Sequence, residues 1–368
     1  MVLQRLSSLK KKSFQLPPLP SHLPELTSVR AIAAFTVVVF HMFFSEQNAP
    51  GFFNNLIADG HLGVDFFFML SGFILTHVYV NQWRGGTFNY AGFLTNRFAR
   101  VYPLHLAMTL LVLLAYQVGK FIGSDSATIG QNWSHLPFHI FLMHAWGFTD
   151  SHSWNFPSWS VSAEAFAYLL FPLILLGCLK VGRLAAMVIG LILFFAASLF
   201  AKAVIGHELT KLMYNFGIIR VFVEFTLGVA IYLILERHRL PQPWVRPGIV
   251  LCVASVLALS GIQADERLIV LTMAVLLACL AQRASMAQGG ILRSRLMIYL
   301  GEISYATYMV HILVLFVAKT IGPKLGLTYG EAPLAVLSII GIYVASAILF
   351  HFIEKPWRVI IRRSLMPA

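Results

Sequence analysis

Long apolar runs separated by short polar or basic stretches recur along the whole chain. A membrane-spanning helix needs about 20 consecutive, mostly apolar residues. Ten runs approach that length, at residues 26–45, 61–80, 100–122, 160–179, 184–204, 217–235, 248–262, 267–282, 302–320 and 333–353. The seventh and eighth are short, and Asp265, Glu266 and Arg267 divide them at an expected turn. The pattern predicts an all-α polytopic membrane protein with about ten transmembrane helices.

A further apolar run at 136–147 is too short to cross a bilayer, and we interpret it as a re-entrant or interfacial segment. Residues 1–25 are polar, basic and rich in proline, and the run after them lacks the small-residue cleavage site of a signal peptide. We therefore expect a cytoplasmic N-terminal tail over 1–25, a transmembrane domain over 26–353 and a cytoplasmic C-terminal tail over 354–368.

The composition supports this division. Apolar residues make up 58% of the chain and charged residues 11%, whereas soluble domains carry about 25% charged residues. The mean hydropathy of +0.77 excludes a protein that is solvated by water alone. Cys178, Cys252 and Cys279 lie inside apolar runs without a paired spacing. We expect them to be small buried residues, and we expect no metal site.

The distribution of basic residues predicts the orientation. A formal charge of +12 could indicate a nucleic-acid partner, but the basic residues recur in short clusters between apolar runs, as in cytoplasmic loops. Of the 27 Lys and Arg residues, 19 fall on the side of the two termini and seven on the other, with Arg30 inside the first span. The loop 123–159 has neither Lys nor Arg. Both termini are therefore expected in the cytoplasm and this loop outside it.

Several ionisable residues lie inside the predicted spans, where they are costly and usually face the bundle interior. Arg30 and His41 are 11 residues apart in the first span, so they share a helix face and are separated by about 16 Å along its axis. Asp65 begins the second span near the level of His41 and could accept a proton from one imidazole nitrogen. The alternatives are a snorkelling arginine, a hydrogen-bonded core histidine and a helix-capping aspartate.

Two arginines mark the cytoplasmic start of the third span. Arg97 and Arg100 have an i, i+3 spacing that places both guanidinium groups on one helix face. Such a pair suits a polyphosphate, although ordinary cytoplasmic anchors have the same composition.

Further polar residues gather in the outer half of the predicted bundle. Glu164 lies one turn into the fourth span, Arg220 begins the sixth, and His311 lies midway in the ninth. Phosphate-binding groups at the cytoplasmic end and His, Asp, Glu and Arg at the outer end indicate a donor that enters from inside and an acceptor that waits outside. A hydrogen-bonded core histidine is the alternative for His311, and Ser71 with Gly72 could simply allow close helix packing.

Five sequence blocks, in this order, resemble those of the family-3 membrane acyltransferases, which modify bacterial surface glycans. They are Arg30-x10-His41, residues 62–73 (LGVDFFFMLSGF), Arg97-x-x-Arg100 followed by Val101-Tyr102-Pro103, residues 159–164 (WSVSAE), and Glu354-Lys355-Pro356. Together they cover most of the chain.

The resemblance implies about ten helices in the bacterial inner membrane, a cytoplasmic acyl-CoA donor (usually acetyl-CoA) and a hydroxyl of an extracytoplasmic glycan, such as an exopolysaccharide or lipopolysaccharide, as acceptor. Many relatives carry an additional extracytoplasmic esterase-like domain. This chain ends shortly after its tenth span, so we expect the membrane domain or a partner, a second copy included, to complete the transfer. The expected roles are as follows: His41, Asp65 and Glu164 in catalysis; Arg30, Arg97, Arg100 and Ser71 at the donor; and Arg220, Trp159 and His311 at the acceptor.

In this interpretation His41 is a general base or a nucleophile, oriented by Asp65 or Glu164, and Ser71 is an oxyanion donor. A transporter or flippase without chemistry is the competing class, since buried charges suit it equally well. The chain shows neither the internal repeat nor the paired broken helices of many transporters. A purely structural membrane scaffold leaves the clustered His, Asp and Glu residues without a role.

Overall fold

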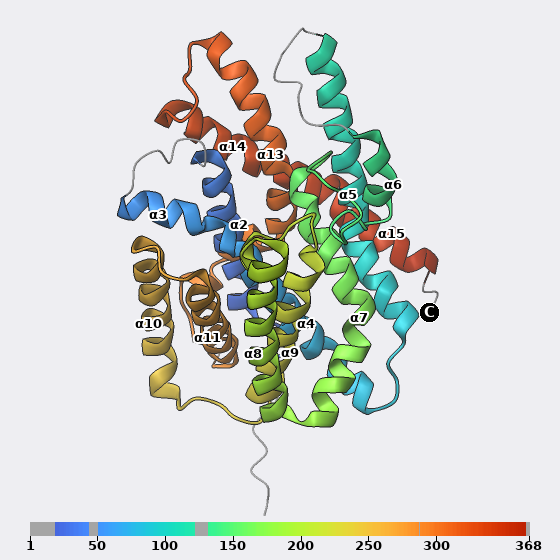
Figure 1. Cartoon of the computed structure of the whole chain (residues 1–368), viewed down its shortest axis with the longest axis vertical. Helices are drawn as coiled ribbons and strands as arrows, with labels where there is room; N and C mark the ends of the chain where they lie inside the picture. Colours follow the sequence, from blue (N-terminus) through green and yellow to red (C-terminus); the bar gives the residue numbers. More distant parts are fainter. Residues whose placement is uncertain (1–18, 44–50, 122–131, 287, 366–368) are drawn as a thin grey trace, which may run out of the picture.

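The computed structural model describes residues 19–43, 51–121, 132–286 and 288–365. Within these ranges the chain is helical and contains no strand, which confirms the predicted fold class (Figure 1). The helices are α2 (Pro24–Phe43), α3 (Phe52–Ala58), α4 (Gly63–Arg84), α5 (Tyr90–Phe121), α6 (Leu136–Ile140), α7 (Trp159–Val181), α8 (Arg183–Phe200), α9 (Gly217–Leu235), α10 (Gln242–Gly261), α11 (Glu266–Ser285), α12 (Arg295–Glu302), α13 (Ser304–Ile321), α14 (Ala332–Leu349) and α15 (Lys355–Leu365).

Ten of the described helical segments are long and apolar enough to cross a membrane, as the sequence predicts. The uncertain seventh and eighth spans correspond to α10 and α11, which have 20 residues each and are longer than expected. The turn between them is where the charged residues predict it. The Asp265 carboxylate caps α11 by accepting a hydrogen bond from the Arg267 backbone N–H at 2.9 Å.

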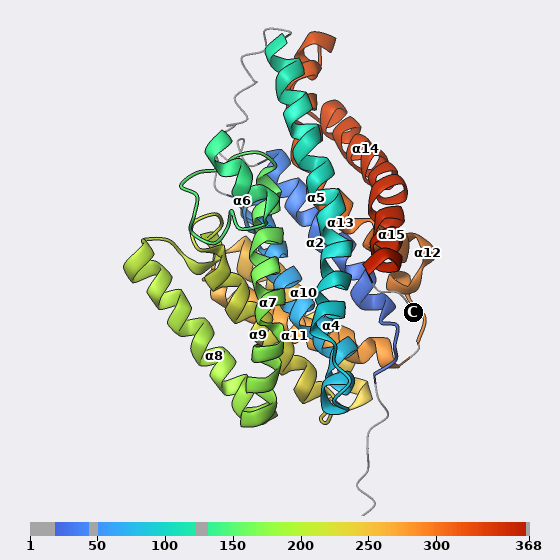
Figure 2. The same ribbon diagram turned by 90° about the vertical axis from the view of Figure 1, so that its right-hand side faces the viewer.

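The close contact between α4 and α9 depends on glycine. A Cβ atom on Gly72 would lie 2.1 Å from the Phe225 carbonyl oxygen, and one on Gly228 would lie 1.9 Å from that of Met69. Small residues let transmembrane helices approach closely enough for backbone-to-backbone contact. The proposed packing role of Gly72 is therefore confirmed, and the α4–α9 pair lies between α7 and α11 (Figures 1 and 2).

Residues 132–155 lie beside the middle of α5 and over the start of α7, and they contain the short helix α6 (Figure 2). The segment is anchored by Ser162 on α7, whose hydroxyl donates to the Leu142 carbonyl at 2.8 Å and accepts from the Ala145 N–H at 3.0 Å. The apolar run 136–147 is thus a segment with one short helix that lies against the bundle rather than a span.

Stacked imidazoles fill the space beneath this segment. The rings of His139 and His144 are 3.7 Å apart at an angle of 10°, and the His105 ring lies 5.9 Å from that of His144. Burial lowers the pKa of His139 to about 3 and the pKa of His144 well below its ordinary value, and the neighbouring imidazoles add to both shifts. These side chains are neutral at pH 7.

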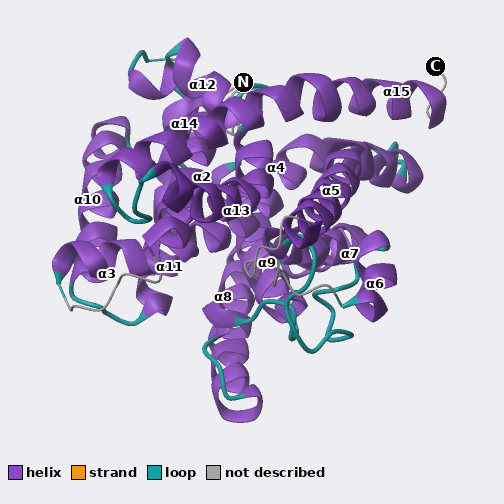
Figure 3. Cartoon of the chain, turned by 90° about the horizontal axis from the view of Figure 1, so that it is seen from above, coloured by secondary structure: helices purple, strands orange, loops and turns teal. Residues whose placement is uncertain are grey.

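The chain after α14 remains helical. A single π-helical turn, Phe350–Glu354, leads into α15, which extends sideways from the bundle (Figure 3). The expected C-terminal tail therefore contains an amphipathic helix through Leu365, with Trp357 and Ile360 half exposed and with Arg362 and Arg363 exposed.

Candidate active site

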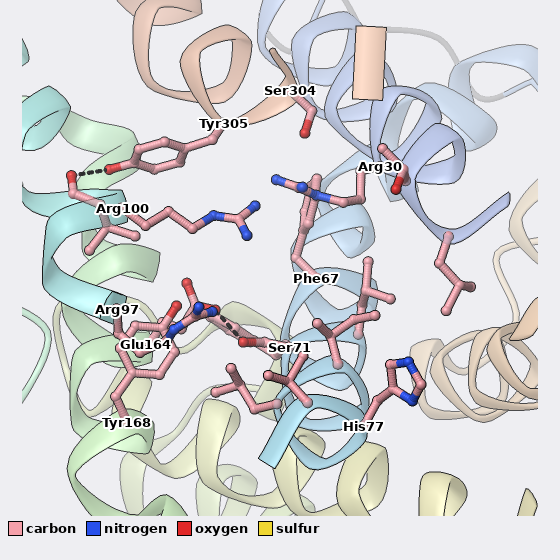
Figure 4. A pocket seen from close by; sticks show the side chains of 18 of the residues that line it. Arg30, Phe67, Ser71, His77, Arg97, Arg100, Glu164, Tyr168, Ser304 and Tyr305 are labelled. Carbon is pink, nitrogen blue, oxygen red and sulfur yellow. Dashed lines mark hydrogen bonds between the residues drawn. The ribbon is translucent and has the colours of Figure 1, made fainter. Parts of the chain in front are cut away.

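A pocket of about 290 Å³ lies among α2, α4, α5, α7 and α13. Its polar lining includes the donor residues predicted from the sequence, and these are Arg30, Ser71, Arg97 and Arg100. Figure 4 shows Arg30 and Arg100 reaching toward one another across the pocket from α2 and α5, with Arg97 beside Glu164. Helices that are distant in sequence thus bring three guanidinium groups to one space.

None of the three arginines makes a direct ion pair, although the Glu164 and Glu354 carboxylates act on them from a greater distance. In the part of the chain that the structure describes, none of them has a hydrogen bond or a carboxylate oxygen within 4.0 Å, and Arg97 Nε is buried without a partner. A buried unpaired charge is costly, and buried cations are normally paired. Three unpaired guanidinium groups around a cavity form a site for a multiply charged anion.

Glu164 lies in this pocket and not at His41. The Ser71 hydroxyl donates to Glu164 Oε1 at 2.5 Å, so each side chain uses the other as its partner. Glu164 therefore does not contact His41, which corrects the expectation that it orients His41, whereas the catalytic role of Glu164 and the oxyanion role of Ser71 stay predictions. The cause is the helix register, which places Ser71 of α4 opposite Glu164 of α7.

His41 is paired with His311. His41 Nδ1 lies 2.9 Å from the Val37 carbonyl oxygen and 3.2 Å from His311 Nε2. A carbonyl can only accept, so Nδ1 of neutral His41 carries the proton and Nε2 is the basic nitrogen. By the same argument, His311 Nδ1 donates to the Tyr308 carbonyl at 2.6 Å, which leaves His311 Nε2 as an acceptor for His41. His311 therefore takes the orienting position that we expected a carboxylate to hold.

The Asp65 carboxylate pairs with Arg220 and not with His41, which corrects the expectation that it orients His41. Its two carboxylate oxygens accept hydrogen bonds from Arg220 Nε at 2.9 Å and Nη2 at 2.5 Å, and both side chains are almost fully buried. A buried guanidinium requires such a bidentate partner. The Arg220 guanidinium also lies 5.3 Å above the Trp159 ring, and Trp159 is 5% exposed.

These contacts place Arg220 and Trp159 inside the packed core between α4, α7 and α9. Both side chains are packed against protein groups in this structure, and the expected contact with the acceptor stays a prediction. Glu224, which the sequence analysis did not consider, is fully buried and lies 3.9 Å from Arg220 Nε. Its i, i+4 spacing from Arg220 is the signal that could have identified it.

The pocket and the histidine pair meet at Tyr308, a residue that the sequence analysis did not single out. Tyr308 lines the pocket, its ring lies 5.8 Å from that of His311, and its phenolic oxygen accepts a hydrogen bond from Ser160 at 2.9 Å. The Phe67 ring, also in the lining, lies 6.3 Å from Tyr308. Tyr308 therefore connects the lining of the pocket with the histidine pair.

Comparison with known proteins identifies relatives of the whole chain. It is 29% identical over 374 aligned positions to the acyltransferase MdmB of Streptomyces mycarofaciens, with 93% of each chain covered. It is 23% identical to the peptidoglycan O-acetyltransferase OatA of Listeria monocytogenes, and the alignment covers 92% of this chain but only 56% of that protein. The chain thus spans about half the length of this second relative.

No solved structure matches the chain. The family model described as an acyltransferase domain, however, matches residues 23–351, a range that includes the arginine pocket and both histidines. The chain therefore belongs to the family-3 membrane acyltransferases.

Proposed function

We propose that this protein is a membrane O-acyltransferase that moves an acyl group from cytoplasmic acyl-CoA, with acetyl-CoA as the main donor, to a hydroxyl of an extracytoplasmic glycan. The observation that carries the proposal is a pocket lined by three arginines in which one lining residue, Tyr308, also contacts His311 of the histidine pair. The Listeria relative is a peptidoglycan O-acetyltransferase by name, which supports a glycan of the cell surface as acceptor.

The donor would bind with its phosphates on Arg30, Arg97 and Arg100. Arg30 and His41 are 11 residues apart on α2, so they are separated by about 16 Å along the helix axis. The pantetheine arm of CoA is an extended chain that separates its phosphates from its sulfur. Bound along α2, it would carry the thioester from the arginines past Phe67 and Tyr308 toward His41.

In the proposed reaction the acceptor hydroxyl attacks the thioester carbonyl while His41 Nε2 removes the hydroxyl proton. The carbon–sulfur bond then breaks, the new ester forms, and the proton passes from His41 to the departing CoA thiolate. The single His41 Nδ1–H is shared between the Val37 carbonyl and His311 Nε2, and both acceptors would stabilise the imidazolium. A positioned base of this kind contributes about 10²- to 10⁴-fold to the rate.

Family membership and the pairing of His41 with His311 both argue against a transporter without chemistry. A transport site needs charges that bind and release its substrate, but it needs no basic imidazole nitrogen directed by a second histidine. Acyl transfer by the purified protein distinguishes the two classes.

The donor site is tested with Arg97→Ala and Arg100→Ala, singly and together. Each charge-assisted contact contributes roughly 1.5–3 kcal/mol, so each single variant should weaken CoA binding by about 10- to 150-fold in calorimetry. The matched control is Arg246→Ala with Arg295→Ala, because both arginines are exposed and lie outside the pocket lining. Unchanged CoA affinity in the folded Arg97→Ala, Arg100→Ala protein would contradict the donor assignment.

A further inference from the structure

An aromatic cluster surrounds His41 on the side that does not line the arginine pocket. The Phe40 ring centroid lies 4.8 Å from that of His41, and the Phe156 centroid lies 5.6 Å from it. The His152 ring in turn lies 4.4 Å from both Phe156 and Tyr214, at 72° and 85°. We call Phe40, His152, Phe156 and Tyr214 the outer aromatic cluster.

The members of this cluster come from three separate parts of the chain. Phe40 belongs to α2, His152 and the adjoining Phe156 to the end of the covering segment (132–155) and the turn before α7, and Tyr214 to the turn before α9. None of the four lines the arginine pocket. The rings next to His41 therefore form a set of side chains separate from the pocket lining.

The outer aromatic cluster is also the accessible side of the histidine pair. His311 is fully buried, whereas His41, Phe156 and Tyr214 are partly exposed and His152 is exposed. A molecule that reaches His41 without passing through the donor pocket would pass along these rings.

Polar groups border the cluster. The His61 ring lies 5.3 Å from that of Phe40, and Lys211 Nζ lies 2.8 Å from His61 Nε2 and 2.8 Å from Glu266 Oε1. Lys211 is exposed. Aromatic faces next to a few hydrogen-bonding groups are typical of a site for a ligand that has both apolar and polar surfaces.

We propose that the outer aromatic cluster is the acceptor-binding site, and that it holds a sugar ring with one hydroxyl directed at His41. A pyranose has an apolar face of C–H groups that fits an aromatic ring and a rim of hydroxyls that fits Lys211 and Glu266. A long-chain alcohol would use the rings but leave the polar border unused. This inference rests on the proposed acyl transfer and adds the place where the acceptor binds.

The test uses Tyr214→Leu and His152→Leu, because both side chains reach the surface and neither lies in the core. The matched control is Phe148→Leu, an exposed ring of the same covering segment that stacks on Phe138, outside the cluster. The probes are [¹⁴C]acetyl-CoA with tetra-N-acetylchitotetraose, maltotetraose or cellotetraose, and 1-hexanol as the acceptor without a sugar ring. Saturation-transfer NMR measures sugar binding independently of chemistry, and CoA affinity checks the fold.

We expect the wild-type protein and Phe148→Leu to saturate the ring C–H protons of at least one oligosaccharide. Each cluster variant should raise the acceptor KM by about 2- to 12-fold while CoA affinity stays unchanged. Equal acceptor KM values in the cluster variants and Phe148→Leu would overturn the inference. So would acetylation of 1-hexanol without binding of any oligosaccharide. Both results leave the proposed function intact, whereas absence of transfer from acetyl-CoA to every acceptor contradicts the proposed function itself.

Discussion

The direction of the His41 ring is set by its own helix and by one neighbour. The Val37 carbonyl is one turn before it on α2, and His311 reaches it from α13. In the proposed reaction, His311 in place of a carboxylate would add no buried negative charge and would still stabilise the imidazolium formed when His41 takes a proton.

The first prediction concerns this residue. We expect His41→Gln to lower acyl transfer by at least about 100-fold, because an amide cannot take up a proton near pH 7. CoA affinity and expression should remain close to wild type, since His41 lies outside the lining of the arginine pocket. The measurement is transfer from acetyl-CoA beside calorimetry on the same preparation. A variant that keeps more than about a tenth of the rate would exclude the base role.

At the residue scale the sequence predicts where polar side chains lie on their helices better than it predicts which side chains they contact. The shared face of Arg30 and His41 follows from their separation along one helix, and so does the pairing of Arg97 with Arg100 in one pocket lining. The partner of Asp65 is 155 positions away, and only the packing of α4 against α9 brings Arg220 to it. The two candidate carboxylates, Asp65 and Glu164, and the two histidines offer several plausible pairs, and nothing local in the sequence selects among them.

At the scale of elements, α4 and α9 are joined by glycine contacts and by the Asp65–Arg220 ion pair. The glycines allow backbone contact, and the ion pair fixes the register of one helix against the other. The same pair supports Trp159 at the start of α7. The positions of Ser71 on α4 and Glu164 on α7, and hence one wall of the donor pocket, depend on this arrangement.

The second prediction follows from it. Asp65→Ala leaves Arg220 with only the more distant Glu224, and removing one partner of a buried ion pair costs roughly 3–5 kcal/mol. We expect a lower Tm and less folded protein in a thermal-shift assay. The control is Glu208→Ala, which breaks the exposed Lys202–Glu208 pair and should cost at most about 1 kcal/mol. A fully stable but inactive Asp65→Ala protein would restore the catalytic role that the sequence predicts.

The third prediction concerns the segment that covers α5 and α7. The pKa of His139 is lowered to about 3 and that of His144 lies well below 6.5. Above pH 6.5 both residues are neutral whether the segment is folded or open, so their lowered pKa values do not change the free energy of opening the segment. As the pH falls from about 6.5 toward 3, the open form binds protons that the folded form refuses, and the stability of the segment is lost.

Hydrogen exchange, corrected for the intrinsic effect of pH, measures this loss. Protection of residues 132–155 should decrease between pH 7 and pH 4, while protection of α9 should not. His105 from α5 and His135 face the stack, and the Asp150 carboxylate lies 3.2 Å from His135 Nε2. The acid sensitivity should come from His139 and His144, whose pKa values burial lowers. Constant protection down to pH 4 would mean that the stack is not what holds the segment.

At the scale of the whole molecule the ten spans are the feature that the sequence predicts best. Apolar length is a local property, and a bilayer requires each span to satisfy its backbone hydrogen bonds internally. The pocket is a property of five helices together, and its lining draws on residues from Ser21 to Tyr308. Sequence motifs identify its arginines but give neither the separation between the pocket and the histidines nor the burial of Arg220.

The last prediction is the orientation of the bundle, which decides whether the donor pocket opens toward the cytoplasm. The basic residues favour the side of the termini by 19 to seven, and the loop 123–159 has none. Ser134 is exposed in this loop and Ser364 is exposed on α15. The three native cysteines are buried, so a membrane-impermeant maleimide should report only introduced thiols. We expect Ser134→Cys to react in intact cells and Ser364→Cys to react only after permeabilisation. The reverse pattern would place the arginine pocket on the side without CoA, and the direction of the proposed transfer could not stand.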